Sequence, residues 1–139
     1  MADFLSFNEG RKELANNGLP STCYFLLSTK PCSGTGTLAV TDTLASGVGE
    51  ITGTGYARQS QAEPTASAAN PSAVVFSQMS FATGSATDWS SAVKSVILAT
   101  TADNTGKAIC AWNLQAGGAA RDLSQANTTE QVTPTLNVA

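Results

Sequence analysis

The feature that most constrains the fold of this chain is a series of short strand-forming segments separated by turn residues. Seven or eight such segments follow one another at intervals of roughly 8–15 residues along the 139-residue sequence. Short strands joined by tight turns pair in the antiparallel direction, and one helical segment precedes them. We therefore expect a single, mainly β domain over residues 1–139. The expected form is an antiparallel β-sandwich of jelly-roll or Ig-like type, with a short N-terminal helix and long loops.

Three segments in the body of the chain have the clearest strand patterns. Residues 21–28 are a continuous apolar run, which is typical of a strand buried on both faces. Residues 94–100 also fit a helix, but their β-branched content and short length favour a strand. Residues 107–114 alternate between apolar and other residues, and the turn before them is a hairpin signal. The residues expected on one face of that last strand are Ala108, Cys110, Trp112 and Leu114.

The remaining strand signals are shorter or irregular. Residues 72–81 change register near Ser77–Gln78, which suggests a bulge. Residues 128–132 and 135–138 are separated by Pro134, so we expect them at a sheet edge, where proline is tolerated. The paired glycines that precede these two segments predict a bend.

A short helix is expected near the amino terminus, over residues 7–17. Ser6 and Glu9 have the spacing of a capping box, and Gly18 is suited to end the helix in a left-handed turn. The apolar side of the helix must be buried, either under the β core or against another subunit. The residues of that side are Phe4, Phe7 and Leu14.

Two long polar stretches, residues 29–49 and 61–71, are expected to be extended loops or arms. In the first, only Leu38, Val40 and Leu44 are suited to anchor the chain. A structureless loop of about 20 residues is unusual in a compact domain. We therefore expect it to be functional or to be ordered by a neighbouring molecule.

Between these loops lies the most distinctive stretch of the sequence, residues 49–58 (GEITGTGYAR). Its glycines let the backbone bend, while Tyr56 and Arg58 have the spacing of side chains on one face of a strand. We interpret it as the start of a central strand, with Glu50 as a candidate partner for Arg58. A turn followed by an ordinary strand would explain the same residues. The predicted structural core is Tyr24, Leu26, Tyr56, Arg58, Phe76 and Trp112.

The composition argues against several classes of function. Histidine is absent, which removes the commonest general base and metal ligand, and the three cysteines lack metal spacing. The net charge is −3 and no basic stripe is present, so we expect no nucleic-acid partner. Apolar runs of about five residues are too short to span a membrane. We predict no catalytic residue, no metal site and no cofactor. A Cys23–Cys32 disulfide is the less favoured alternative for a chain expected to stay in the cytoplasm, since no signal-peptide pattern is seen.

Charged residues make up only 12% of the chain, about half the usual share. A surface poor in Lys and Glu costs little to desolvate, as in the cores of protein interfaces. This composition favours a protein held among neighbours, although a loop-rich β domain with a Ser/Thr surface has the same composition. Trp89 could stack on a sugar or lie buried, and Trp112 is expected to be buried.

The order of these pieces resembles the small tailed-bacteriophage structural proteins that are labelled tail fibre or minor capsid proteins. The resemblance lies in the leading helix, the apolar strand at 24–29, the E-x-x-G-x-G-Y-A-R segment from Glu50 to Arg58, and Trp89 before a further strand. It implies a non-enzymatic component of a phage virion, made in the host cytoplasm. We expect a minor or decoration protein that binds and stabilises the major capsid lattice. A tail or tail-fibre component, with a carbohydrate receptor as its ligand, is the alternative.

Under this interpretation the partners are the major capsid protein and further copies of the same chain, with a trimer as the expected oligomer. The arms and the helix are the candidate contact regions. The candidate contact residues are Phe7, Leu14, Leu38, Val40, Leu44 and Trp89.

Overall fold

A computed structural model of the chain describes residues 3–64 and 73–137. One helix, α1 (Asn8–Asn17), and one 3-10 turn, η1 (Ala116–Gly118), accompany the strands. The strands are β1 (Phe4–Ser6), β2 (Thr22–Ser28), β3 (Gln59–Ala62), β4 (Ala73–Val75), β5 (Met79–Ala82), β6 (Ser95–Ala99), β7 (Ala108–Asn113), β8 (Thr129–Val132) and β9 (Thr135–Asn137).

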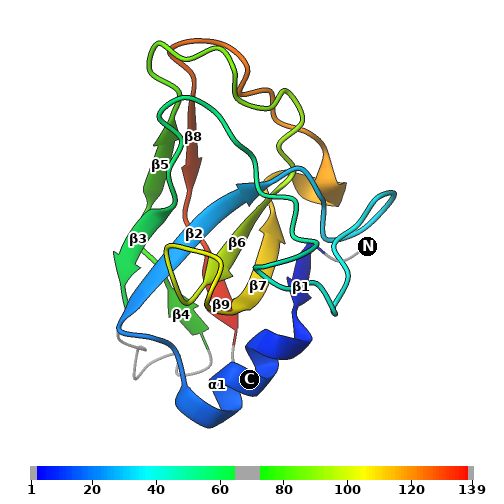
Figure 1. The fold of residues 1–139 in the computed structure, drawn as a ribbon, viewed down its shortest axis with the longest axis vertical. Coiled ribbons are helices and arrows are strands. Elements are labelled where there is room, and N and C mark those ends of the chain that lie inside the picture. Colours follow the sequence, from blue (N-terminus) through cyan, green and yellow to red (C-terminus); the bar gives the residue numbers. More distant parts are fainter. Residues whose placement is uncertain (1–2, 65–72, 138–139) are drawn as a thin grey trace.

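The largest unit is a five-stranded antiparallel sheet in the order β1-β7-β6-β2-β3 (Figure 1). Two further antiparallel pairs, β4–β9 and β5–β8, form a second layer. The prediction of a mainly β, antiparallel chain with one short N-terminal helix is confirmed, and the arrangement is compatible with a β-sandwich. The jelly-roll or Ig-like type stays a prediction.

The larger hydrophobic core lies between the five-stranded sheet and the two strand pairs. At its centre Phe25 of β2 meets Phe76 edge to face, with ring centroids 5.0 Å apart. The central strands β2 and β6 contribute to the cores on both faces, which is why their sequences are continuous apolar runs. Strand β7 also contributes to the cores on both faces. Ala108 and Cys110 were expected on one face of it, but a register shift opposite Ala99 turns Ala108 to the other face, away from Cys110.

A second, smaller core covers the opposite face of the sheet. Leu38, Leu44 and Val48 of the 29–49 loop pack there with Phe7 and Leu26. The ends of the loop meet where Thr29 N donates to Gly49 O at 3.1 Å. The loop is therefore ordered by the chain's own leucines, which anchor it to the sheet without a neighbouring molecule. The alternative expectation, that the loop is functional, stays a prediction. Of the three predicted anchors, Val40 alone is exposed, at 42%.

Helix α1 packs against β7 rather than standing apart. Its N-cap is Phe7, which makes no side-chain cap, so the predicted capping box of Ser6 and Glu9 is wrong. The Glu9 carboxylate instead accepts the Ala108 amide at 2.7 Å, because the helix start lies against β7. Gly18 ends the helix with φ of +70°, as expected.

Several predicted strands appear with small changes of boundary, and residues 94–100 do form a strand, β6. The single strand expected over 72–81 is divided into β4 and β5 at the position of the predicted bulge. Strand β1 was not predicted, because three residues are too few for a periodic pattern. The second predicted arm, 61–71, begins inside β3, and its residues 65–71 lie outside the described residues.

Candidate functional site

The distinctive stretch at residues 49–58 forms an irregular segment that is joined to the five-stranded sheet by hydrogen bonds. Arg58 donates to both Glu50 carboxylate oxygens, the closest approach being 2.7 Å, and its side chain is 6% exposed. The same guanidinium donates to the Asp103 carbonyl and the Asn104 side chain, both at 2.6 Å. It also reaches the Thr101 carbonyl at 3.2 Å. Arg58 therefore ties this segment to the β6–β7 turn, and the predicted Glu50–Arg58 pairing is confirmed.

A second set of contacts fixes the glycine-rich part of the same segment. Trp89 is 4% exposed, donates from its indole nitrogen to Thr54 O at 2.9 Å and stacks edge to face on Tyr56. A side chain at Gly53 would place its Cβ 2.3 Å from the indole ring, so only glycine fits there. The Asp88 carboxylate accepts the Thr54 amide and hydroxyl, and these hydrogen bonds lower the pKa of Asp88. The segment is thus held by the Trp89 ring and by the Asp88 carboxylate.

These contacts correct the interpretation of residues 49–58 as the start of a central strand. The chain becomes a strand only at Gln59, and that strand, β3, lies at the sheet edge. Tyr56 and Arg58 do both point inward with Ala57 exposed between them, and the Tyr56 hydroxyl accepts the Leu27 amide at 3.0 Å. Burial raises the pKa of Tyr56 well above its usual range. These contacts hold residues 49–58 against β2 and the β6–β7 turn.

The predicted core and contact residues divide differently from the expectation. Of the predicted core, Leu26 and Phe76 are fully buried, and Tyr24, Tyr56, Arg58 and Trp112 are partly buried. Four of the six predicted contact residues are instead part of the chain's own hydrophobic cores. Less than 5% of each residue is exposed, so their prediction as partner contacts is wrong. These four are Phe7, Leu38, Leu44 and Trp89. Leu14 is partly buried and Val40 is exposed.

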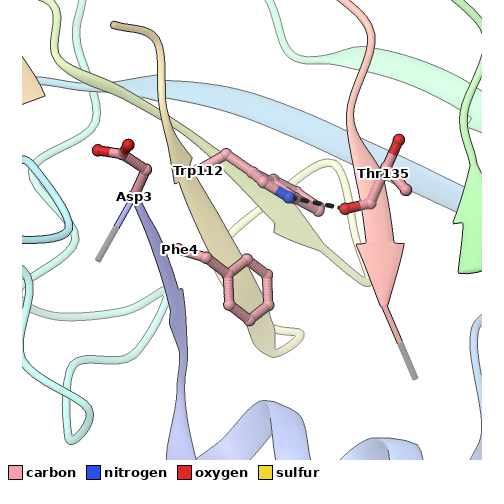
Figure 2. Close-up of a pocket in the computed structure, with 4 residues that line it drawn as sticks. All are labelled: Asp3, Phe4, Trp112 and Thr135. Carbon is pink, nitrogen blue, oxygen red and sulfur yellow. Dashed lines mark hydrogen bonds between the residues drawn. The ribbon is translucent and has the colours of Figure 1, made fainter. Parts of the chain in front are cut away.

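The most exposed aromatic group lies instead at the β1 edge of the five-stranded sheet (Figure 2). Phe4 of β1, 37% exposed, meets Trp112 of β7 edge to face with ring centroids 5.7 Å apart. Trp112 points toward β9, where its indole nitrogen donates to Thr135 O at 3.0 Å. With Asp3, these residues line a hollow of about 300 Å³. The exposure of Phe4 was not predicted, because its position just before the helix favours a place on the apolar side of the helix.

A second apolar hollow, of about 500 Å³, lies on the same side of β1. Its lining residues are Ser6, Leu14 and Ala15 of α1, Gly18, Leu19, Glu63 and Leu136. Phe4 and Ser6 project from the same face of β1, since they are two residues apart on a strand. The β1 edge therefore carries an exposed phenyl ring next to one hollow and a serine next to another.

The three cysteines lie inside the folded chain. Cys23, Cys32 and Cys110 are all free and buried, so the disulfide alternative is incorrect. Burial raises the pKa of Cys23 to about 11 and that of Cys32 to about 12. Thiols in such surroundings are poor nucleophiles at neutral pH.

Two further classes of site were sought within residues 3–64 and 73–137. No group of three or more Cys, Asp or Glu side chains is arranged to hold a metal ion in this part of the chain. The one described helix, α1, is too short and too polar to cross a membrane. Comparison of the chain with protein-family models, with curated proteins and with solved structures finds no match.

Proposed function

We propose that this protein is a non-enzymatic structural component of a tailed-phage virion, bound to the capsid as a minor or decoration protein. The proposal starts from the resemblance carried by the Glu50–Arg58 segment and Trp89. The observation that carries it further is the way the fold uses its few charges. Among the described residues, three ion pairs tie the chain to itself: Arg58–Glu50, Arg121–Glu130 and Lys107–Glu9.

The chain has seven basic and ten acidic residues, and six of these seventeen residues form the three internal ion pairs. The exposed positions of the described chain are mostly Ser, Thr, Ala and Gly. These side chains lose little hydration energy when a neighbouring protein covers them. Such a surface suits a protein that lies across other subunits.

The mechanism under this proposal is stabilisation by mass action. Copies that bind only the assembled shell add their binding free energy to the shell and disfavour its dissociation. Each specific contact with the major capsid protein should bury more than about 1,000 Å². The leucines of the 29–49 loop are buried in the chain's own core, so under this proposal they do not contact the capsid. Val40 is the large apolar side chain of that loop that is exposed to a partner.

Quantitative mass spectrometry of purified particles tests this proposal. A decoration protein should be present at a sizeable fraction of the major capsid protein's copy number, and particles without it should dissociate at lower temperature. A low copy number that follows the tail proteins would reject the capsid position. Absence from mature particles would reject the virion role.

A tail or tail-fibre component that binds a carbohydrate receptor is the second candidate, and the hollow in Figure 2 is the observation that favours it. Phe4, whose ring is exposed, and Trp112, whose ring is partly buried, lie beside this hollow, and such rings are suited to stack on sugars. Trp89, considered earlier for this task, is buried, so Trp112 replaces it as the residue to test. Glycan-array binding that is lost in Trp112→Ala and kept in Trp89→Phe would favour this candidate, whereas an array with no binding would remove it.

A further inference from the structure

We infer that the β1 edge is an interface between two copies of this chain, in which the β1 strands pair antiparallel about a two-fold axis. In this pairing Phe4 of each copy enters the hollow beside Ser6 of the other. The inference goes beyond the proposed function and holds whether or not the chain is part of a virion. It predicts a dimer in place of the trimer expected from the sequence.

The first observation is that the two edges of the five-stranded sheet differ. On the described part of the chain, β1 pairs with β7 alone and β3 pairs with β2 alone. Strand β3 has the sequence Gln-Ser-Gln-Ala and is followed by Glu63 and Pro64, which oppose the addition of another strand. Strand β1 has the sequence Phe-Leu-Ser, with no charge and no proline. Both edge strands are short and β1 is preceded by Asp3, but of the two it is β1 that has an apolar sequence and is not followed by a charge and a proline.

The second observation concerns the direction of the β1 backbone groups. Asp3 O accepts from Asn113 N at 2.9 Å, and Phe7 N donates to Ile109 O at 3.1 Å. In an antiparallel ladder the residues alternate between facing the partner strand and facing away from it. The amides and carbonyls of Phe4 and Ser6 therefore point away from β7. They are oriented to bond a strand added outside β1.

The register of the added strand follows from these groups. With Leu5 of both copies at the two-fold axis, Phe4 of each copy lies opposite Ser6 of the other, and all four outward-facing residues form ladder hydrogen bonds. Side chains directly opposite each other have Cβ atoms about 4.5–5.5 Å apart. A phenyl ring in that position would lie beside the hollow that Ser6 lines together with Leu14, Leu136 and Glu63.

This complementarity is why the occupant is a second copy rather than an unrelated strand. Each chain carries both the exposed ring and the hollow, on the same face of the same three-residue strand. A two-fold axis brings each ring to the other copy's hollow and closes the assembly at two chains. Each phenyl ring, more than a third exposed in one copy, then becomes covered.

The first experiment measures the oligomeric state of the full-length chain by sedimentation velocity over a concentration series. The wild type and Val75→Lys should dimerise alike, because Val75 is an exposed apolar residue on β4, which pairs with β9 and not with β1. Phe4→Lys and Leu14→Glu should raise the dimer dissociation constant by roughly tenfold or more, as expected for losing one buried apolar side chain. A wild type that stays monomeric or forms trimers, or a Phe4→Lys chain that dimerises like Val75→Lys, would overturn the inference.

The second experiment tests the register and does not depend on how well Phe4→Lys folds. Leu5→Cys should form a disulfide-linked dimer under mild oxidation, since opposite Cα atoms at about 4.5 Å fall within disulfide range. Ser6→Cys is the matched control, because two Ser6 positions would lie about 8 Å apart across the axis, too far to bridge. The native cysteines are buried, so the wild type should give no cross-linked band. Equal cross-linking of both variants, or none in either, would refute the pairing.

Discussion

Removing the Arg58 guanidinium should destabilise the fold more than any other single loss of charge in the described chain. The side chain is 6% exposed and holds the Glu50 carboxylate, two carbonyls of the β6–β7 turn and the Asn104 side chain. In Arg58→Met the apolar stem remains and these bonds are lost. Glu50 is then left without its cation in a site where its side chain is only 27% exposed.

The magnitude follows from the burial of the two partners. Breaking a fully buried ion pair by deleting one member costs about 3–5 kcal/mol. Water can reach part of the Glu50 carboxylate and the exposed Asp103 carbonyl, so we take the lower end, about 3 kcal/mol. For a domain of this size that corresponds to a fall in Tm of roughly 10 °C.

Urea unfolding followed by tryptophan fluorescence measures the change in free energy, with Arg11→Met as the control. Arg11 is exposed on α1, and its loss should change the free energy of unfolding by less than about 0.5 kcal/mol. A double-mutant cycle with Glu50→Gln should give a coupling of at least about 1 kcal/mol. If Arg58→Met cost no more than Arg11→Met, the view that this cluster fixes the 49–58 segment would be refuted.

Three further perturbations test other parts of the fold. Gly10→Ala normally favours a helix by about 1 kcal/mol, but here the new Cβ would lie 2.3 Å from the backbone of β7, so we expect a lower Tm; an unchanged or raised Tm would contradict the close packing of α1. The pKa of Asp88 is lowered in the folded chain, so its contribution to stability is present above its unfolded pKa of about 3.9 and is lost as the pH falls through the lower folded value. Asp88→Asn should therefore reduce the slope of stability against pH below about pH 4, and an identical slope would argue against those hydrogen bonds. The raised pKa of Cys110, caused by burial, predicts that this thiol reacts with iodoacetamide at pH 8 only after unfolding, and rapid labelling of the native chain would count against its position in the core.

The regular part of the fold follows from the sequence because its signals are local. Strands β2 and β6 are continuous apolar runs, and a turn joins β6 to β7 as predicted. The alternation predicted for β7 is wrong at Ala108, because the register shift there depends on the pairing with β6. Pro134 separates β8 from β9 as expected, because it cannot donate to a ladder. The Glu50–Arg58 pair was predictable because few residues in this chain carry a charge.

What the sequence did not reveal depends on contacts between distant residues. Leu38 and Leu44 have no periodic neighbours, so nothing local indicates that they pack on the sheet rather than on a partner. Glu9 fits a capping box, but the approach of β7, about 100 residues later, gives its carboxylate a better donor in the Ala108 amide. Trp89 is buried because glycine at position 53 admits its ring.

The proposed role is tested most directly by locating the chain on intact phage particles by cryo-electron microscopy at modest resolution. The account predicts density for many copies at repeated positions over the capsid lattice, each in contact with major capsid subunits. Particles in which the chain is absent, or purified protein that turns over a substrate on its own, would contradict the claim that it is a structural component of the virion.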